Sequence, residues 1–242
     1  MCPLSIYSAD VAPLALITGA SRGIGAAIAR DLAADHDLLL GGRDADALGA
    51  LAASLPGATA WPVELTDDAA LATAVAGIDR LDVLAHSAGV GLLGTVADTP
   101  ADTWRRQFEV NVVAVAELTR LLLPALRAAR GRVVLLNSGA GHNARAGWAS
   151  YAASKFALRA FADALRAEEE DHGVRVTSVH PGRTDTDMQR SVVAQERGEY
   201  KVQHYLRVES VAAAVGLAVR ATDDAELTEI TVRPARNRPP IG

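Results

Sequence analysis

Tyr151 and Lys155 lie four residues apart at the start of a segment whose apolar spacing predicts a helix. Side chains at this spacing project from one face of a helix, so the phenol and the ammonium can act together. A tyrosine has an ordinary pKa of about 10, and a neighbouring ammonium lowers that pKa because it favours the phenolate. The pair predicts proton transfer to or from a substrate oxygen, although an ordinary solvated helix pair has the same spacing.

Two further observations favour the catalytic interpretation. Ser138 follows an apolar run that predicts a strand, and an open α/β sheet places its chemistry at such strand ends. Lysine occurs only as Lys155 and Lys201, although basic residues number 24. A chain that otherwise uses arginine therefore has a compact ammonium where this chemistry needs one. We expect Ser138 to donate a hydrogen bond to the substrate oxygen and to stabilise the charge that develops there.

The segment from Thr18 to Gly25 places three glycines between a predicted strand and a predicted helix. Gly19 permits a tight turn, Gly23 lets the backbone approach a pyrophosphate, and Gly25 lets the helix lie close to the sheet. The first helical turn offers free N–H groups and a partial positive charge to phosphates. A glycine loop that only turns the chain is the alternative, but the strand, turn and helix together predict a dinucleotide site.

The end of the second predicted strand indicates which dinucleotide binds. An NAD site normally has a carboxylate there for the ribose 2′-hydroxyl, whereas an NADP site has space and positive charge. Gly42 stands at that position, Arg43 follows it, and Arg22 lies in the glycine turn. Two guanidinium groups suit a 2′-phosphate, so NADP(H) is expected. Asp44 is the alternative ribose ligand, and its other interpretation is the N-cap of the next helix.

Short apolar runs alternate with longer alanine-rich segments of helical period, which predicts βα units around a parallel sheet. The predicted strands are 14–18, 38–41, 59–63, 83–86, 133–137, 174–180 and 229–232. The predicted helices are 23–34, 44–54, 67–76, 102–129, 150–172 and 210–221. This order predicts an α/β, single-domain Rossmann fold, with a doubly wound seven-stranded parallel sheet and helices on both faces. The domain spans 1–242, and a polar connection at about 183–208 is expected to be a substrate loop or lid.

Composition excludes several classes of protein. The chain has 242 residues, 50% of them hydrophobic, and a net charge of −5 without a Lys/Arg-dense stretch, which argues against a nucleic-acid partner. Cys2 is the single cysteine, so no disulfide within the chain and no cysteine-built metal site are expected, and no residues are assigned as metal ligands. The most apolar helical stretch contains Glu117, Arg120 and Arg127, so no membrane span is expected. A cytoplasmic location is the expectation.

These motifs together resemble the short-chain dehydrogenase/reductase family, in its classical and NADP(H)-preferring group. The resemblance rests on the string TGASRGIG, on Ser138, Tyr151 and Lys155 with their intervals, and on the pair Pro181-Gly182, and it spans roughly 12–234. In that family an asparagine completes a water-linked proton relay to the lysine. Its position matches Asn111, for which a buried asparagine that kinks a helix is the alternative.

The resemblance also implies which residues contact the cofactor. They are Gly19, Ser21, Arg22, Gly23, Ile24, Gly25, Arg43, Glu64, Leu65, Ser87, Ala88, Gly89, Tyr151, Lys155, Pro181, Gly182, Thr184 and Thr186. After the third strand, Thr66 and Asp67 continue the segment that lines the adenine pocket in the family, and either could equally be a helix cap. The chain departs from the family at His86, where an asparagine is usual.

The function that the resemblance implies is an NADP(H)-dependent oxidoreductase, a carbonyl reductase or alcohol dehydrogenase. It would transfer hydride between nicotinamide C4 and a ketone, aldehyde or secondary alcohol, with Tyr151 as acid and base. A non-catalytic NADP(H)-binding sensor is the alternative, and it has no need of the complete set Asn111, Ser138, Tyr151 and Lys155. An epimerase or dehydratase of the extended branch has a different glycine spacing and an added substrate domain.

The sequence also suggests a class of substrate and an oligomeric state. Candidate walls of the substrate pocket are Trp148, Met188, Tyr200 and Tyr205, and apolar walls would favour a poorly polar carbonyl or alcohol substrate. The two long helices commonly pair with their copies in this family, so a homodimer or homotetramer is expected.

Overall fold

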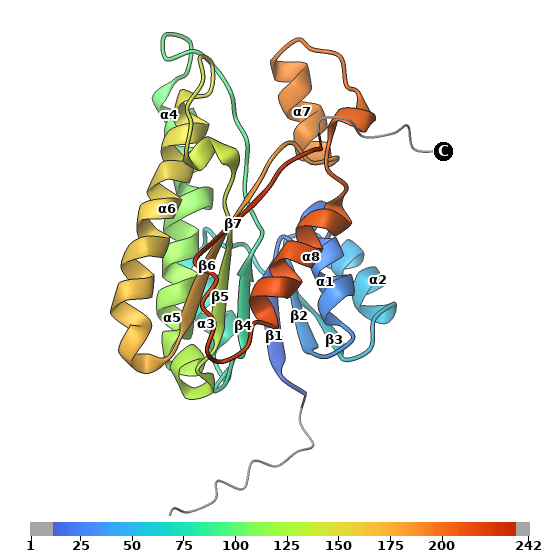
Figure 1. Ribbon diagram of the computed structural model, residues 1–242, viewed down its shortest axis with the longest axis vertical. Coiled ribbons are helices and arrows are strands. Elements are labelled where there is room, and N and C mark those ends of the chain that lie inside the picture. The colour runs from blue at the N-terminus through green and yellow to red at the C-terminus, as the bar shows by residue number, and fades with distance from the viewer. Residues whose placement is uncertain (1–11, 236–242) are drawn as a thin grey trace, which may run out of the picture.

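A seven-stranded parallel sheet runs through the centre of the molecule, of which the computed structural model describes residues 12–235 (Figure 1). Cys2 lies outside the described residues. The strands are β1 (Leu14–Thr18), β2 (Asp37–Gly42), β3 (Ala58–Pro62), β4 (Val83–His86), β5 (Arg132–Leu136), β6 (Arg175–Pro181) and β7 (Glu229–Val232). Their order is β3-β2-β1-β4-β5-β6-β7, so the sheet grows first to one side of β1 and then to the other. Ligands of such sheets bind at this switch point, beyond the carboxyl ends of the strands.

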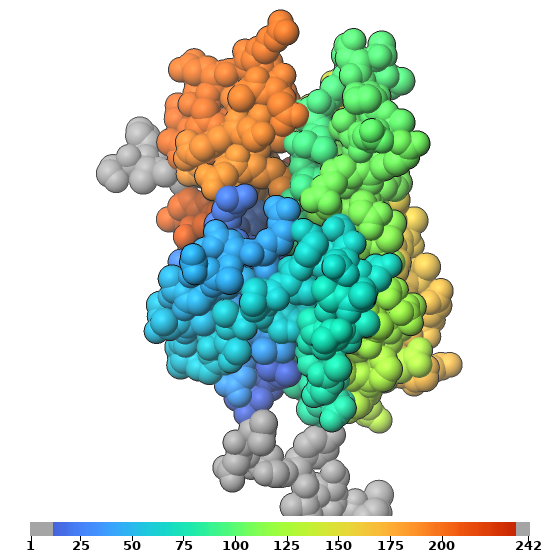
Figure 2. Space-filling model, turned by 180° about the vertical axis from the view of Figure 1, so that it is seen from behind, coloured from blue at the N-terminus to red at the C-terminus, as the bar shows by residue number. Residues whose placement is uncertain are grey.

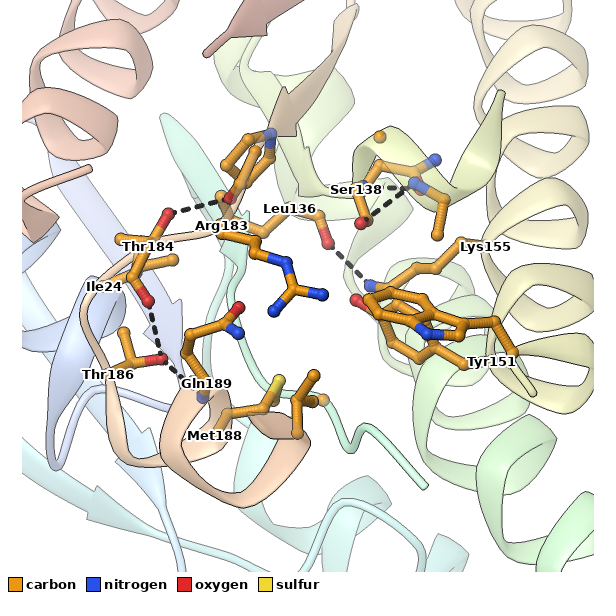
Figure 3. A pocket seen from close by; sticks show the side chains of 18 of the residues that line it. Ile24, Leu136, Ser138, Tyr151, Lys155, Arg183, Thr184, Thr186, Met188 and Gln189 are labelled. Atoms are coloured by element: carbon orange, nitrogen blue, oxygen red, sulfur yellow. Dashed lines mark hydrogen bonds between the residues drawn. The ribbon is translucent and has the colours of Figure 1, made fainter. Parts of the chain in front are cut away.

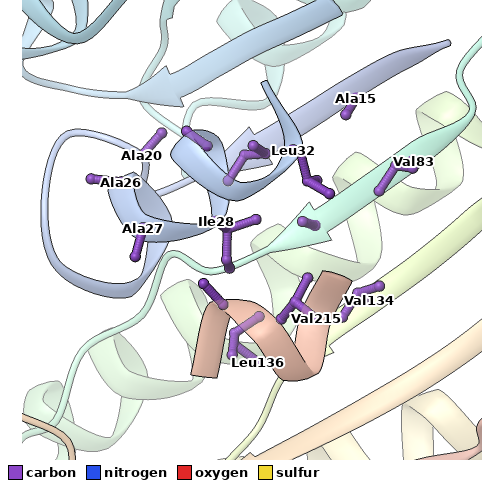
Figure 4. Close-up of a cluster of buried hydrophobic side chains, with 14 of the residues drawn as sticks. Ala15, Ala20, Ala26, Ala27, Ile28, Leu32, Val83, Val134, Leu136 and Val215 are labelled. Atoms are coloured by element: carbon purple, nitrogen blue, oxygen red, sulfur yellow. The ribbon is translucent and has the colours of Figure 1, made fainter. Parts of the chain in front are cut away.

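Helices cover both faces of the sheet. One face carries α1 (Gly23–Leu32), α2 (Ala45–Ala53) and α8 (Val208–Val219), and the other carries α3 (Asp68–Val75), α5 (Ala114–Ala129) and α6 (Ala149–Glu169) (Figure 1). Side chains of a strand alternate between the two faces. In β1, Ala15 and Ile17 accordingly lie in the core beneath α1 and α8, and Leu16 lies in the core on the opposite face. Figure 4 shows the first of these cores, with Ala15, Ile28 of α1 and Val215 of α8.

The predicted fold is confirmed. Strands β1, β4 and β7 have the predicted bounds, and the other strands differ by one residue at either end. Runs that are apolar at nearly every position are easy to recognise because a parallel strand is buried on both faces. Within residues 12–235, no helix combines the length and the apolar character needed to cross a membrane.

The predicted helix 102–129 is interrupted. It consists of α4 (Ala101–Phe108), a π-helical turn at Glu109–Val113, and α5. A π-turn inserts one residue per turn and shifts the side chains that follow it, and it often occurs at functional sites. Apolar periodicity did not reveal this turn, which contains Asn111.

The connection at 183–208 is also more ordered than its sequence predicted. It contains α7 (Asp187–Gln195), which lies beyond the carboxyl ends of the strands (Figure 1). Thr186 is the N-cap, because its hydroxyl accepts a 3.1 Å hydrogen bond from the Gln189 N–H. A bridge between Thr184 and Leu206 joins the two ends of the segment. The segment therefore contains a helix, and its two ends are paired with each other.

Candidate active site

The glycine turn after β1 forms one end of a groove, a cavity of about 440 Å³ at the switch point of the sheet. Gly19 has φ +67°, and a Cβ there would lie 2.8 Å from the Cα of Ala88. A Cβ on Gly25 would collide with the carbonyl oxygen of Gly19, so α1 begins in direct contact with the turn. Gly23 has φ +58°, which L side chains rarely adopt. Each glycine is required by backbone geometry.

The N-terminus of α1 is free to bind an anion. Arg22 is the N-cap residue, its side chain makes no capping hydrogen bond, and the first turn contains no acidic residue. The unpaired N–H groups and the helix dipole together favour a phosphate at this position. The residues therefore fit the pyrophosphate of a dinucleotide.

Three arginines line the same cavity. Arg22 lies 3.8 Å from a carboxylate oxygen of Asp187, and Arg43 lies 3.6 Å from one of Glu64. All four side chains are well exposed, so these ion pairs are weak and exchangeable. The third is Arg106, which the sequence analysis did not identify.

Asp44 does not line this cavity. Its carboxylate accepts a 3.0 Å hydrogen bond from the Ala47 N–H and caps α2, as the N-cap interpretation predicted. Asp67 caps α3 in the same way, through the Ala70 N–H. Both acids are thus engaged in helix capping.

The loop after β4 connects this cavity to a second one. The Thr18 hydroxyl accepts 3.1 Å hydrogen bonds from the N–H groups of Ser87 and Ala88, which fixes the loop against β1. The loop Ser87–Val90 lines both cavities, as do Ile24, Thr186 and Met188. The two cavities are therefore parts of one groove, and the space-filling view shows a hollow below the orange α7 segment (Figure 2).

His86 fits its position without a functional role. Its side chain is buried, and Nε2 lies 2.9 Å from the hydroxyl of Thr119. That hydroxyl donates its own hydrogen to the Val115 carbonyl, so it accepts from His86 Nε2–H. Burial lowers the pKa of His86 to about 3, and the ring is neutral.

Ser138, Tyr151 and Lys155 line the second cavity, of about 480 Å³, beyond β5 (Figure 3). The Ser138 hydroxyl lies near enough to the Tyr151 phenol to lower its pKa. Ser138 is held in turn by Asn137, whose side-chain oxygen accepts a 2.9 Å hydrogen bond from the Ser138 N–H. The end of β5 and the start of α6 thus present three reactive groups to one space.

Burial changes the acidity of the two titrating groups. Burial raises the pKa of Tyr151, and the Ser138 hydroxyl opposes this rise. Burial lowers the pKa of Lys155 to about 8. The Lys155 ammonium donates a 2.9 Å hydrogen bond to the Leu136 carbonyl and lies 6.0 Å from the Tyr151 ring centroid. Tyr151 therefore holds its proton at neutral pH beside a cation.

Asn111 lies behind the cavity rather than in its wall. Its side chain is buried, accepts a 2.9 Å hydrogen bond from the Val90 N–H, and donates to the Val90 carbonyl at 3.0 Å. It also donates to the Ser154 hydroxyl at 3.1 Å. The π-turn places this amide between the loop after β4 and helix α6.

Comparison with known proteins identifies the family. The family model described as "short chain dehydrogenase" matches residues 13–197. This chain belongs to the short-chain dehydrogenase family.

Individual relatives agree with this assignment. The chain is 37% identical over 203 residues to "Dehydrogenase/reductase SDR family member 7B" of Bos taurus, covering 77% of this chain and 62% of that protein. The chain thus spans less than two thirds of that relative. An alcohol dehydrogenase of Thermococcus sibiricus, solved with 5-hydroxy-NADP, superimposes with a TM-score of 0.84 at 25% identity, covering 95% of this chain and 99% of the other. A metagenomic short-chain oxidoreductase solved with NADP has a TM-score of 0.79 at 30% identity and covers 94% and 99%.

The structure brings the predicted site residues of this short-chain dehydrogenase together. Every residue expected to contact the cofactor lines one of the two cavities, and among the expected catalytic residues only Asn111 lines neither. Of the expected substrate walls, Trp148 and Met188 line the second cavity, but Tyr200 and Tyr205 do not. The Tyr200 hydroxyl instead donates a 2.5 Å hydrogen bond to Asp185, which precedes α7.

The walls of the second cavity are more polar than the sequence predicted. Arg145, Arg183 and Arg233 line it, and its described lining contains no Asp or Glu. The Arg183 guanidinium projects into the middle of the cavity, opposite Tyr151 (Figure 3). The family motif gave no signal for these arginines, because it leaves loop positions free.

Proposed function

We propose that this short-chain dehydrogenase is an NADP(H)-dependent oxidoreductase that interconverts a ketone or aldehyde with the corresponding alcohol. The observation that carries the proposal is the joint placement of Ser138, Tyr151 and Lys155 in one cavity of a groove that also fits a dinucleotide. In that groove the free N-terminus of α1 faces the phosphate end, and the phenol lies at the other end.

The proposed chemistry is proton transfer coupled to hydride transfer. When bound, NADPH supplies a hydride from nicotinamide C4. In the direction of reduction, Tyr151 donates its proton to the substrate oxygen, and Ser138 donates a hydrogen bond to that oxygen. Burial keeps Tyr151 protonated before the reaction, since it raises the pKa of the phenol.

Lys155 stabilises the phenolate that proton donation leaves on Tyr151. Below pH 8 its ammonium is charged, and an opposite charge close to the phenol favours the phenolate form. One of its three N–H donors binds the Leu136 carbonyl, so the others can bind ribose hydroxyls of the cofactor. Asn111 holds the loop after β4 beside this cation, through both backbone groups of Val90.

The proposed cofactor preference is NADP(H). It is supported by Arg22, Arg43 and Arg106, which surround the ribose end of the groove, and by the engagement of Asp44 in capping α2. Guanidinium groups bind phosphate in a bidentate manner, and the weak ion pairs of Arg22 and Arg43 cost little to exchange. Two solved relatives bind NADP or a derivative of it.

A panel of ketones and aldehydes tests this function, with NADPH consumption followed by its absorbance. We expect at least one carbonyl compound to be reduced, faster with NADPH than with NADH. NADPH binding without consumption by any member of a broad panel would instead favour the sensor hypothesis.

The proposed assembly is a homodimer or homotetramer in the cytoplasm, with the segment 183–208 as a substrate lid. Val113, at the end of the π-turn before α5, and Phe156, in α6, support the assembly, since these apolar residues are 47% and 43% exposed. Met188, Gln189 and Val192 of α7 line the second cavity and support the lid. Sedimentation equilibrium would give the number of subunits.

A further inference from the structure

Three side chains that are far apart in the sequence converge behind Ser138. His142 follows the turn after β5, His180 lies in β6, and Glu229 begins β7 at the edge of the sheet. One potential ligand atom of each lies within 4.8 Å of those of the other two. None of the three lines either cavity of the groove, so the cluster is separate from the site described above.

The hydrogen bonds of His180 determine which ring nitrogen carries its hydrogen. Nδ1 lies 3.0 Å from the Ser138 carbonyl oxygen, and a carbonyl can only accept. Nδ1 therefore bears the hydrogen, and Nε2 presents a lone pair when the ring is neutral. The side chain is 0% exposed, and its burial lowers the pKa of the imidazole, which favours the neutral form.

That lone pair has nothing to bind in the described part of the chain. Within residues 12–235, Nε2 of His180 has no hydrogen-bond partner. Oε1 of Glu229, which is also an acceptor, lies 3.7 Å from this nitrogen. His142 Nε2 lies 3.9 Å from the other oxygen of Glu229. A buried acceptor facing a carboxylate is costly unless something positive lies between them.

We propose that His142, His180 and Glu229 form a binding site for a divalent transition-metal cation of the Zn²⁺ class. Two imidazoles and one carboxylate are a common three-residue set for zinc, with a fourth position left for water. The hydrogen bond from Nδ1 to a backbone carbonyl is also what a ligating histidine usually makes, because it fixes the ring with Nε2 toward the metal.

The three side chains must move closer together to bind the ion. Tetrahedral zinc with bonds of about 2.05 Å separates its ligand atoms by about 3.3 Å, so ligand atoms that lie within 4.8 Å of one another must close by up to about 1.5 Å. His142 follows a turn and is partly exposed, so it can move and gives the ion a path from solvent.

Arg159 is a cation that opposes this site. Its Nε donates a 3.0 Å hydrogen bond to Oε1 of Glu229. The other oxygen, Oε2, faces His142 and is free to bind the metal, while Arg159 holds the carboxylate from behind. Hydrogen bonds of this kind orient ligating carboxylates in known metal sites.

Metal titration of the full chain, without any histidine tag and after chelator treatment, tests the site. Zn²⁺ binding is measured by calorimetry and Co²⁺ binding by its visible absorption, for the wild type and for His142→Ala and Glu229→Gln. His204→Ala is the matched control, since it removes an exposed histidine far from the cluster. These variants avoid the buried His180, whose replacement could unfold the protein.

We expect one Zn²⁺ per chain in the wild type and in His204→Ala, and binding at least about tenfold weaker in His142→Ala and Glu229→Gln, because removal of a second-shell partner alone costs that much. Zn²⁺ should also raise the unfolding temperature of the wild type more than that of His142→Ala. No stoichiometric binding, or equal binding by all four proteins, would overturn the proposal and leave a water molecule as the partner of His180.

A different observation concerns the substrate, and it rests on the proposed function. Arg145 and Arg183 lie over the ring of Trp148, with guanidinium carbons 6.0 Å and 5.8 Å from its centroid. The Trp148 ring in turn contacts the ring of Tyr151 edge-on at 5.7 Å. The two guanidinium groups thus lie one aromatic ring away from the proposed proton donor.

A carboxylate already pairs with one of the two arginines. Glu196 accepts two hydrogen bonds from Nη2 of Arg183, at 2.6 Å and 2.7 Å, and leaves Nη1 and Nε of that guanidinium for a ligand. Arg145 has no ion pair among the described residues. We infer that this subsite binds an anionic group, such as a carboxylate, on the carbonyl substrate, since guanidinium groups pair with carboxylates in a planar, bidentate manner.

Paired substrates test the subsite. The protein is assayed with oxo acids and with their methyl esters, as wild type, as Arg145→Met and Arg183→Met, and as Arg30→Met, a control at an exposed position on α1. We expect the acids to be preferred, and each subsite variant to lose at least about tenfold in kcat/KM for acids only, or about 1.4 kcal/mol. Equal use of esters would overturn the subsite but not the proposed function, and reduction of neither class would overturn both.

Discussion

The side-chain amide of Asn111 exchanges two hydrogen bonds with the backbone of Val90, accepting from its N–H at 2.9 Å and donating to its carbonyl at 3.0 Å. A single buried side chain thus pairs both polar groups of one residue in the loop that connects the two cavities. This arrangement explains why an amide, with one acceptor and two donors, occupies the π-turn.

Asn111→Leu should therefore destabilise the protein. The substitution leaves the partly buried Val90 N–H and carbonyl without their side-chain partner, and each loss costs about 1–2 kcal/mol, the lower part of the range for an unpaired buried group. We expect the free energy of unfolding to fall by about 2–4 kcal/mol in urea titrations. Gln203→Leu, at an exposed position, is the control and should change it little. Equal stability of Asn111→Leu and the wild type would contradict this role of the amide.

The stability of the protein should depend on pH through His86. Its pKa is about 3 when folded and 6.5 for an ordinary histidine, so between these values only the unfolded chain binds the proton. Stability therefore falls as pH decreases below 6.5, by up to about 1.4 kcal/mol per pH unit. Thermal unfolding between pH 5 and pH 7 should show this slope, and it should be shallower in His86→Asn. If stability depended on pH equally in the wild type and in His86→Asn, a group other than His86 would cause the dependence.

Reduction should decline on the alkaline side as Lys155 loses its charge. Its pKa of about 8 predicts a fall in kcat/KM for the carbonyl substrate above pH 8. Tyr151 does not explain such a limb, because burial raises its pKa above the ordinary value of 10.0. In Lys155→Arg the residual activity should lack this limb, since a guanidinium stays charged. If kcat/KM of Lys155→Arg fell above pH 8 as it does in the wild type, a group other than Lys155 would cause the fall.

Cofactor choice should depend on Arg43 and Arg22, and not on Asp44. Arg43→Leu and Arg22→Leu should each raise the KM for NADPH about tenfold, a loss of about 1.4 kcal/mol, and leave the KM for NADH unchanged. Asp44→Ala should leave the ratio of the two cofactors unchanged and lower stability by about 1 kcal/mol, because it removes the cap of α2. If the wild type preferred NADH and Asp44→Ala lost that preference, Asp44 and not the two arginines would select the cofactor.

The sequence predicted the sheet and the groove well because both depend on local patterns. Continuous apolar runs specify buried parallel strands, and the glycines after β1 are required by backbone contacts such as that of Gly19 with Ala88. Helix α7 was missed, although Thr186 and Gln189 form the Thr-x-x-Gln spacing of a helix start. That helix is polar, and its three buried residues are too few to make a clear apolar period.

Other features were not predictable because they depend on contacts between distant segments. His142, His180 and Glu229 meet only when β6 and β7 pair and the turn after β5 folds over them. The hydrogen bond that holds the buried His86 ring goes to Thr119 of α5, which is 33 residues away in the sequence. Arg183 follows a recognisable Pro-Gly pair, but its side chain lines the cavity while it pairs with Glu196, the C-cap of α7, a contact between segments that the motif does not specify.

The central claim is that the Tyr151 phenol supplies the proton for carbonyl reduction. The most direct measurement compares wild type and Tyr151→Phe, with NADPH binding followed by fluorescence and single-turnover reduction followed by absorbance. We expect Tyr151→Phe to bind NADPH as the wild type does and to reduce the carbonyl at least about a hundredfold more slowly, the usual contribution of general acid catalysis. Reduction at the wild-type rate by Tyr151→Phe would contradict this claim.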